Sequence, residues 1–451
     1  MQKREFLKIS SAIVTAPLFT GLIGCNNNKE NVSSIKNWAG NLTYSIDKVT
    51  QVEEASQVNA LVKQFDKVKA LGTRHCFNTI ADSKDQFISL TEMNPDIVIN
   101  EEQSTVTINS GIKYGQLSPF LHEKGYSLHN LASLPHISVA GACATATHGS
   151  GEKTGNLSTA VAAMEFVNGD GETVNLSREK DGDNFNAAVV HLGAIGIITR
   201  LTLDIKPTFL MKQYVYENLP LTSLKEHFDE IQKSGYSVSL FTNWQSDNIA
   251  EVWIKRKDDD PAPEPEKEWF GATLATKNMH PIPELSAENC TEQMGISGPW
   301  FDRMPHFKMG FTPSSGVELQ SEYFVPRQNA VDAIMAISKL RDQVGPHLFT
   351  SEIRTIAADN FWMSPCYKQD SVSIHFTWKQ EVEAVGRLMP IIEKELAPLG
   401  LRPHWGKLFT IKPEELEKAY ERMPEFRELA KHYDPNGKFR NDFLNQNLFF
   451  R

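Results

Sequence analysis

Gly72-Thr73-Arg74-His75-Cys76-Phe77-Asn78 follows a short, largely apolar stretch, Val68–Leu71, and prediction of the fold starts from these residues. The apolar stretch predicts a strand that runs into a tight loop, in which glycine lets the backbone pass close to a ligand. Arg74 brings a fixed positive charge, and His75 offers a nucleophilic ring nitrogen. Because a single loop histidine is more often structural than functional, the loop needs support from elsewhere in the chain.

A second stretch about sixty residues later is rich in small side chains: His129-Asn-Leu-Ala-Ser-Leu-Pro-His-Ile-Ser-Val-Ala-Gly-Ala-Cys-Ala-Thr-Ala-Thr-His-Gly-Ser-Gly151. Small side chains let backbone N–H groups approach an anion closely, and hydroxyls add donors. No Gly-x-Gly-x-x-Gly opens a helix after the first strand, and no Gly-x4-Gly-Lys-Ser/Thr is present. From composition alone, an anion cradle and a tightly packed crossing of small residues are equally good interpretations.

Together the two stretches resemble the flavin-binding segments of the vanillyl-alcohol-oxidase family (PCMH-type, FAD-linked oxidases), and especially its alditol or xylitol oxidases. The resemblance implies an α+β fold in which a vanillyl-alcohol-oxidase-type FAD-binding domain is joined to an α/β substrate (cap) domain. It also implies that His75 carries FAD covalently. The further residues expected to contact FAD are Ser133, Ser138, Gly141, Thr145, Ala146, Thr147 and His148, together with the backbone around Ala70, Leu71, Gly72, Thr73, Arg74, Cys76 and Ile197.

Two later strands predict the substrate pocket. Glu352 and Arg354 are two residues apart on one strand, so both side chains point to the same face, and the same holds for His375 and Thr377. Four converging polar residues suit a polyhydroxylated ligand, whose hydroxyls need donors and acceptors. A solvated sheet face with a surface ion pair is the alternative for isolated residues. The surrounding sequences resemble the alditol-oxidase pocket, which favours function and implies that Ser133 also faces the substrate.

The same resemblance assigns roles to the charged residues. Arg354 and Lys407, which ends Arg-Pro-His-Trp-Gly-Lys, would stabilise the developing alkoxide and the reduced flavin. Glu352 and His375 would hydrogen-bond substrate hydroxyls, with His375 as a candidate proton acceptor. Thr377 and Ser133 would fix the orientation of the substrate.

The implied activity is an FAD-dependent oxidoreductase reaction on sugar alcohols such as xylitol and sorbitol at the terminal hydroxyl. Hydride would pass to flavin N5, and O2 or another acceptor would reoxidise the flavin, with O2 giving H2O2. One alternative is an aldonolactone (gulonolactone-type) oxidase or dehydrogenase. Another, of a different class, is a lipoprotein that binds flavin or polyol without turnover.

The N-terminus predicts export. Residues 1–25 combine a basic start with an apolar segment, Ile9–Ile23, that is too short for a membrane span. They end in Leu-Ile-Gly-Cys25, which resembles a lipobox, so Cys25 is the expected site of a lipid anchor. Residues 26–35 would form a flexible tether. We therefore expect a signal peptide and a membrane-anchored lipoprotein that faces the periplasm or the cell exterior.

Three further regions follow: an FAD-binding domain over 36–207, a substrate (cap) domain over 208–403, and a C-terminal segment over 404–451 that returns to the first domain. The C-terminal segment is expected to contain one helix, at about 413–433. An unbroken strand is expected over 192–205.

The region between 255 and 310 is the least regular part of the sequence. Its charged, proline-rich beginning, 255–267, predicts a surface loop. The rest suits a lid or an interface, and we favour an interface.

Charge and cysteine content limit the remaining partners. A formal net charge of −10 argues against nucleic acid, because binding a phosphate backbone normally needs a basic face. After Cys25, the spacing of the remaining four cysteines matches neither a metal site nor a dense disulfide framework. A single disulfide is compatible with the spacing, with the pair undetermined among Cys76, Cys143, Cys290 and Cys366.

Overall fold

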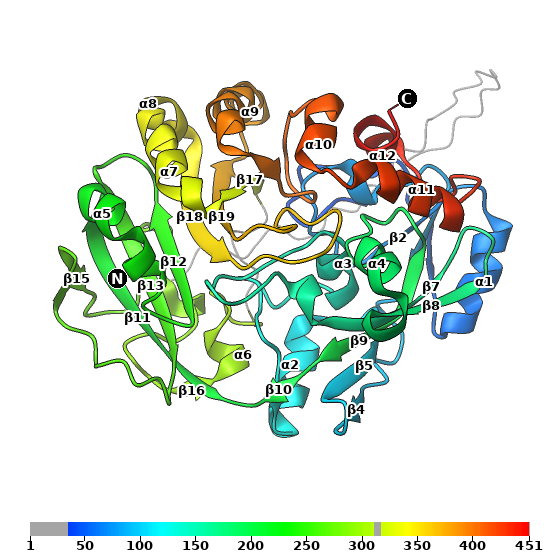
Figure 1. Ribbon diagram of the computed structural model, residues 1–451, viewed down its shortest axis with the longest axis horizontal. Coiled ribbons are helices and arrows are strands. Elements are labelled where there is room, and N and C mark those ends of the chain that lie inside the picture. Colours follow the sequence, from blue (N-terminus) through cyan, green and yellow to red (C-terminus); the bar gives the residue numbers. More distant parts are fainter. Residues whose placement is uncertain (1–34, 311–316, 451) are drawn as a thin grey trace, which may run out of the picture. The chain divides into compact units, whose positions relative to one another are not determined.

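The computed structural model describes residues 35–310 and 317–450, which belong to one compact unit (Figure 1). The predicted signal peptide, the predicted lipid attachment site Cys25 and almost all of the predicted tether lie outside the described residues. Among the residues described, no helix has the length and apolar character needed to cross a bilayer. The domain boundaries at 207 and 403 remain predictions.

Two larger sheets and one two-stranded sheet form the first part of the fold, and the expected mixture of short strands and helices is present. A parallel sheet contains β1 (Val49–Gln51), β3 (Gln86–Ser89) and β2 (Val68–Ala70), in that order. An antiparallel sheet has the order β4 (Val98–Asn100), β5 (Thr105–Asn109), β9 (Ile197–Asp204), β7 (Val161–Val167), β8 (Thr173–Ser177). The accompanying elements are α1 (Ala55–Gln64), α2 (Tyr114–Glu123), β6 (Tyr126–Ser127), α3 (Val139–Ala144), α4 (Arg178–Val189) and β10 (Lys206–Pro207).

The second part is built on one ten-stranded sheet. Its strands are β11 (Leu210–Pro220), β12 (Ser237–Thr242), β13 (Asn248–Lys257), β14 (Glu268–Trp269), β15 (Ala272–Leu274), β16 (Gly298–Pro299), β17 (Glu318–Pro326), β18 (Leu348–Ile356), β19 (Ser371–Lys379) and β20 (Arg402–Pro403). Its path is β14-β15-β11-β13-β12-β18-β19-β17-β20, with β16 paired to β11. The helices of this part are α5 (Leu221–Gln232), α6 (Trp300–Arg303), α7 (Ala330–Lys339), α8 (Arg341–Val344) and α9 (Val382–Leu396).

The two faces of this large sheet differ in composition. On β17 the apolar residues Leu319, Tyr323 and Val325 join the core that packs against α5, α7 and α9 (Figure 1). The alternate residues Glu318 and Glu322 point to the other face and are equally buried. Buried carboxylates are costly unless they are paired, so this inner polar face is where a site is expected.

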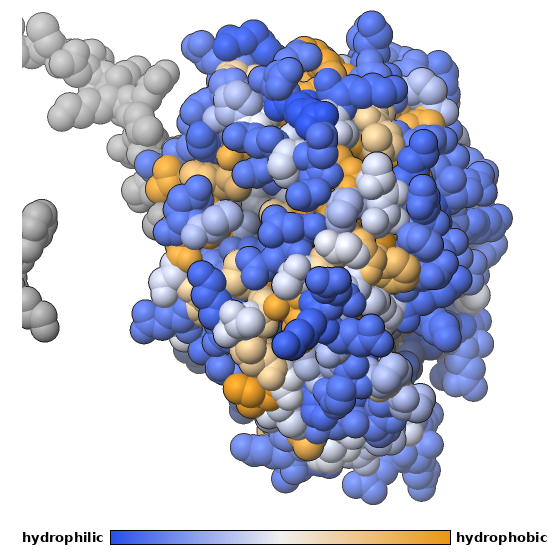
Figure 2. All heavy atoms as spheres, turned by 90° about the vertical axis from the view of Figure 1, so that its left-hand side faces the viewer, coloured by the Kyte–Doolittle hydropathy of each residue, from blue (hydrophilic) through white to orange (hydrophobic). Residues whose placement is uncertain are grey.

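The outside of the molecule gives a different picture. The side over β15 and α5, which faces the reader in Figure 2, is mostly hydrophilic, with apolar side chains visible between polar ones. Isolated apolar residues are normal on a folded surface. The polar residues that need an explanation are therefore the buried ones of the inner face.

The C-terminal segment contains α10 (Pro413–Ala419), α11 (Met423–Tyr433) and α12 (Asp442–Asn447), so the prediction of one helix over 413–433 was wrong. The chain leaves the helical conformation at Tyr420, and Pro424 lies in the first turn of the next helix, where its missing N–H costs nothing. Beyond α11, Lys438 O accepts from the N–H of Val68 on β2 at 3.0 Å, which brings the C-terminal segment against the first part of the fold.

Two other expectations were also wrong. The chain at 192–196 is a loop before β9 and not a strand, because Leu192 and Gly193 have positive φ angles of 56° and 70°. Lys255 is not in a surface loop: it belongs to β13 and is only 1% exposed. Its ammonium group is hydrogen-bonded inside the protein, which makes burial of a lysine tolerable.

Candidate active site

The loop after β2 is shaped by its contacts with the small-residue segment. A Cβ atom on Gly72 would lie 2.8 Å from Ser138 Oγ, so glycine is needed for close approach. The left-handed residue of the loop is Arg74, with φ of 62°, and not the glycine. The Arg74 side chain is exposed, and its Nη1 donates to Lys36 O at 3.2 Å. This contact directs the guanidinium group of Arg74 toward Lys36, near the beginning of the described residues.

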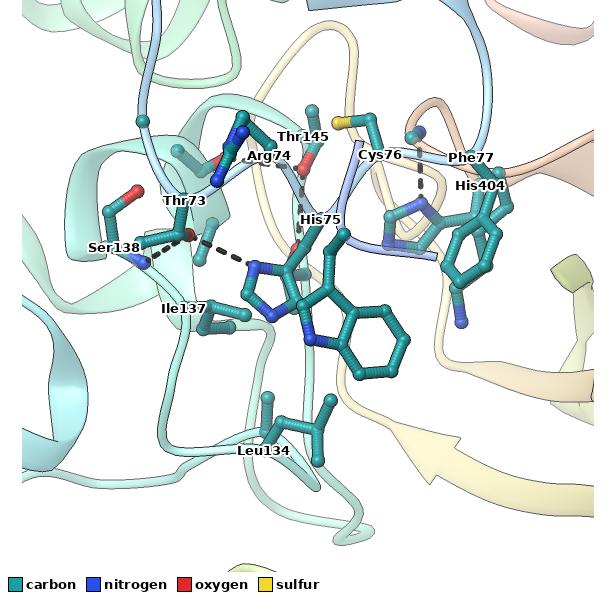
Figure 3. Close-up of a pocket in the computed structure, with 18 of the residues that line it drawn as sticks. Thr73, Arg74, His75, Cys76, Phe77, Leu134, Ile137, Ser138, Thr145 and His404 are labelled. Atoms are coloured by element: carbon teal, nitrogen blue, oxygen red, sulfur yellow. Dashed lines mark hydrogen bonds between the residues drawn. The ribbon is translucent and has the colours of Figure 1, made fainter. Parts of the chain in front are cut away.

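His75 lies at the centre of this loop (Figure 3). Its Nδ1 is 3.1 Å from Thr73 Oγ1, which also accepts from the N–H of Ser138 at 3.1 Å. The ring stacks on Trp38 with 5.3 Å between centroids. Burial, followed by the charge of His136, lowers the pKa of His75 to about 4. The ring is therefore neutral at pH 7, and among the described residues its Nε2 has no hydrogen-bond partner.

The small-residue segment contains the short helix α3. A Cβ on Gly141 would be 2.8 Å from Ser138 Oγ, so this second glycine also lines a tight channel. Thr145 Oγ1 donates to Gly141 O at 3.3 Å and is 3.2 Å from Thr147 Oγ1. Together with the His75 loop, these residues line a cavity of about 340 Å³ that extends to the polar face of the large sheet.

Most residues predicted to contact FAD line this cavity, but Ala146 and Ile197 are not among the described residues that do. Ile197 belongs to a core cluster with Val58 and Val62, while its neighbour Ile198 lines the cavity. Successive side chains of β9 point to opposite faces, so the expected contact of the Ile197 backbone with FAD stays a prediction. Ala146 has a positive φ of 53° and is buried in the core.

Strand register brings the predicted substrate residues together. His375 on β19 is paired with Glu352 on β18 and with Glu322 on β17, which places the three side chains in one row across the sheet. Thr377 lies in the next row, opposite Gln320. All five residues line the cavity and are thus brought together on one face, but Glu322 and Gln320 were not predicted as site residues.

Glu322 is the centre of the charge cluster. It receives Arg354 Nη2 at 2.8 Å and Lys407 Nζ at 2.6 Å, and His148 Nε2 lies 3.0 Å away. Burial alone would raise the pKa of Glu322, but the charges of Lys407, His148 and Arg354 hold it well below its usual range. The carboxylate therefore balances the two cations that were predicted to act on the substrate.

Arg354 connects this cluster with the small-residue segment. Its Nη1 is 3.5 Å from Ser133 Oγ and 3.3 Å from His148 O. Its Nε lies 3.6 Å from Glu352 Oε1 and has no hydrogen-bond partner among the described residues. One buried guanidinium donor of a residue that lines the cavity is thus left without a hydrogen bond.

Glu352 has a partner that was not predicted, His306, whose Nε2 lies 2.7 Å from Glu352 Oε1. Burial would raise the pKa of Glu352, but Arg354 and His306 hold it well below its usual range. His375 Nε2 lies 3.0 Å from Gln320 Oε1. Burial and then Lys407 lower the pKa of His375 well below its usual value, so the ring suits hydrogen bonding better than holding a transferred proton.

The region between 255 and 310 contributes directly to the cavity wall through His280, Ile282 and Leu285 as well as His306. These residues form part of the cavity wall, while the expectation of an interface for the rest of the region stays a prediction. The four cysteines considered for a disulfide, Cys76, Cys143, Cys290 and Cys366, are all free thiols.

The missed residues differ in how far the sequence could reveal them. Glu318, Gln320 and Glu322 recur at a spacing of two on a strand, the same signal that identified Glu352 and Arg354. His306 carries no such signal, because it follows an irregular, proline-containing segment and reaches the site only through tertiary folding.

Comparison with known proteins agrees with this geometry. A model of FAD binding domains matches residues 46–177, and the model of D-arabinono-1,4-lactone oxidases matches residues 201–447. An alditol oxidase from Streptomyces sp. is 42% identical over 415 residues, covering 91% of this chain and 98% of that protein. An L-gulono-1,4-lactone dehydrogenase from Mycobacterium tuberculosis is 27% identical over 429 residues, covering 91% and 98%.

Among solved structures, cholesterol oxidase from B. sterolicum superposes with a TM-score of 0.74 at 14% identity, covering 95% of this chain and 100% of that chain. At this identity the similarity concerns the fold alone. The predicted fold class, an FAD-binding domain joined to a substrate domain, is confirmed.

Proposed function

The chain belongs to the D-arabinono-1,4-lactone oxidase family of FAD-dependent oxidases, and we propose that its substrates are sugar alcohols such as xylitol and sorbitol. The observation that carries this proposal is the buried polar face shared by β17, β18 and β19. It offers acceptors at Glu352 and Gln320 and donors at Arg354 and Thr377, which is what a chain of hydroxyl groups requires. The relative that is 42% identical is an alditol oxidase, which supports the same substrate class.

The lining of the cavity fits FAD. The sites at Gly72 and Gly141 would be closed by a Cβ, and a neutral His75 has an unpaired ring nitrogen. When bound, FAD supplies the hydride acceptor of the oxidation. We infer that His75 holds FAD covalently, since an uncharged imidazole keeps a nucleophilic nitrogen at neutral pH.

The protein's own contribution is charge and position. Arg354 and Lys407 stabilise the alkoxide that develops as the substrate loses its hydroxyl proton. Glu322 keeps both cations ionised and aimed at the cavity. Glu352 and His375 bind neighbouring hydroxyls, and Thr377 with Ser133 fixes which carbinol carbon is presented.

Steady-state turnover tests the substrate class directly. We expect the purified protein to oxidise xylitol and sorbitol with release of H2O2. Turnover of L-gulono-1,4-lactone without turnover of either alditol would instead favour the lactone oxidases, whose name the matching family model carries. A flavin spectrum that stays oxidised after anaerobic addition of all three compounds would favour a non-catalytic binding protein.

A spectrum of acid-precipitated protein tests the covalent bond. We expect the yellow colour to remain with the precipitate of the wild type and to pass into the supernatant for His75→Ala. His129→Ala is a matched control, because His129 lies outside the cavity lining and should leave the flavin in the precipitate. Colour in the wild-type supernatant would contradict the covalent assignment.

We also propose that the protein is exported and anchored through a lipid on Cys25. The support is the sequence of the first 25 residues. Metabolic labelling with a radioactive fatty acid should mark the wild type and not Cys25→Ala, and absence of label from both would contradict the anchor.

A further inference from the structure

The hydrogen bond from His306 to Glu352 continues to a buried lysine on a neighbouring strand. Lys255 on β13 is 1% exposed, and its Nζ lies 2.5 Å from Met304 O, 2.8 Å from Pro305 O and 3.2 Å from His306 Nδ1. The other ring nitrogen of His306 is 2.7 Å from Glu352 Oε1. Lys255, His306 and Glu352 form one continuous buried chain that ends at the cavity.

Hydrogen-bond counting fixes the direction of this chain. Glu352 is ionised, because its pKa is held well below its usual range, and an ionised carboxylate only accepts hydrogen bonds. The ring proton of His306 is therefore on Nε2 and is donated to Glu352, which leaves Nδ1 as an acceptor facing Lys255 Nζ. Burial lowers the pKa of Lys255 to about 7, and both forms of its amine have N–H groups that can donate to Nδ1. The opposite tautomer would point a nitrogen lone pair at a carboxylate, leaving both without a donor.

The His306 ring is also held sterically. It makes edge-to-face contacts with Phe241 at 5.4 Å and with Trp253 at 5.3 Å between centroids. Its backbone N–H donates to Ser133 O at 3.1 Å, which ties it to the small-residue segment. Ring position is thus set by packing, and the Nε2–H tautomer is favoured from both sides, by donation to Glu352 and by acceptance from Lys255.

Glu352 is the group that this chain of hydrogen bonds holds in position. Its Oε1 is occupied by His306 and lies near Arg354, whereas within the described chain no hydrogen bond reaches Oε2. A carboxylate held at one oxygen presents the other in a fixed direction, and Glu352 lines the cavity. That free oxygen is suited to accept a hydroxyl proton of a ligand.

We propose that Lys255 is a positioning residue for the substrate: it fixes the Nε2–H tautomer of His306, which holds Glu352 ready to accept a substrate hydroxyl. The substrate part of this inference rests on the proposed function. Burying a lysine costs desolvation energy, and an apolar residue of similar size can often replace a buried charge without loss of stability. Packing alone therefore does not explain a lysine at this position.

The tautomer can be observed without any turnover. In the holoenzyme labelled with ¹⁵N-histidine, the two-bond ¹H–¹⁵N pattern distinguishes Nε2–H from Nδ1–H, and the signal absent from His306→Phe assigns the residue among 13 histidines. We expect Nε2–H in the wild type and a mixture of both tautomers in Lys255→Met, which keeps the side-chain length. An Nδ1–H ring in the wild type, or an unchanged pattern in Lys255→Met, would overturn the proposal.

Kinetics test the coupling to substrate. In the wild-type background Lys255→Met should lower kcat/KM for xylitol about tenfold, mainly through KM, because a hydrogen bond to a charged group is weakened in both the bound substrate and the transition state. In the His306→Gln background the amide has no tautomer to choose, so the same Lys255→Met change should cost less than about twofold.

Equal losses in the two backgrounds would mean that Lys255 does not act through His306, and would overturn the inference. Flavin content and thermal midpoint, measured for every variant, separate misfolding from a positioning effect. If the wild type oxidises no alditol or lactone, the proposed function fails, while the tautomer measurement still decides the part played by Lys255.

Discussion

Removing the charge of Glu322 tests the central arrangement of the site. Glu322→Gln preserves the size of a side chain that is 1% exposed, but it removes the negative charge shared by Arg354 and Lys407. Gln can still accept one hydrogen bond, so the change concerns charge more than packing. Two cations would then face each other in a buried site without a counter-ion.

The expected loss of stability follows from the contacts of Glu322. At an effective dielectric constant of 20, unit charges 4 Å apart attract by about 4 kcal/mol, and Glu322 has two such partners. Desolvation cancels several kcal/mol of this for each ion, so the measured effect of breaking a buried pair is about 3–5 kcal/mol. We therefore expect the free energy of unfolding of Glu322→Gln to fall by about 3–5 kcal/mol at pH 7.

Glu251→Gln is a matched control on the same sheet. Glu251 is 3% exposed and accepts from Trp253 Nε1 at 2.7 Å, but no cation contacts it in the described chain, and burial raises its pKa to about 7. Its replacement by an amide should cost about 1 kcal/mol or less. Urea unfolding followed by fluorescence, at equal flavin content, provides the comparison. Equal losses for the two variants, or a loss under about 1 kcal/mol for Glu322→Gln, would refute the charge-balance argument.

Two further predictions concern the scaffold. Burial lowers the pKa of His129 to about 4 in the folded state, against about 6.5 in the unfolded chain. Between these two pH values the unfolded chain binds more protons, so the free energy of unfolding falls by about 1.4 kcal/mol for each unit by which the pH is lowered. His129→Gln should therefore make the urea midpoint less sensitive to pH between 4 and 6.5, and an unchanged slope would show that His129 titrates normally. A Cβ on Gly111 would lie 1.8 Å from the backbone oxygen of Leu90, so Gly111→Ala should lose about 3 kcal/mol or more. Gly386 of α9 is the control, because a Cβ there would have nothing within 4 Å. Gly386→Ala should raise the free energy of unfolding by about 0.5–1 kcal/mol. Equal thermal midpoints for the two variants would argue against the close contact at Gly111.

Local patterns were sufficient where one strand carries the information. Alternation placed Glu352 and Arg354 on one face of their strand, and His375 and Thr377 on one face of theirs. The structure brings all four residues to the same cavity. The turn between β7 and β8 has a local signal of the same kind, the sequence Asn168-Gly-Asp-Gly171, in which Gly171 adopts a φ of 72°.

Patterns could not supply what tertiary contacts decide. Arg74 takes the left-handed conformation of its loop, while its side chain reaches the backbone of Lys36. Ile197 and Ile198 are indistinguishable by composition, and only the position of β9 in its sheet determines which of the two side chains lines the cavity.

Lys255 shows why charge in a sequence is an unreliable guide to exposure. A run of charged residues and prolines after it suggested a solvated loop, yet the strand β13 carries Lys255 into the core. Burial is possible because carbonyl groups of Met304 and Pro305, about fifty residues later, replace water around its ammonium group. The same argument applies to Glu322: a polar residue at a core-facing strand position indicates either a poor strand prediction or a partner elsewhere in the chain. In this fold the partners are Arg354 and Lys407. Because three buried charges are tolerated only when they are paired, the Glu322 carboxylate holds the two cations beside the cavity.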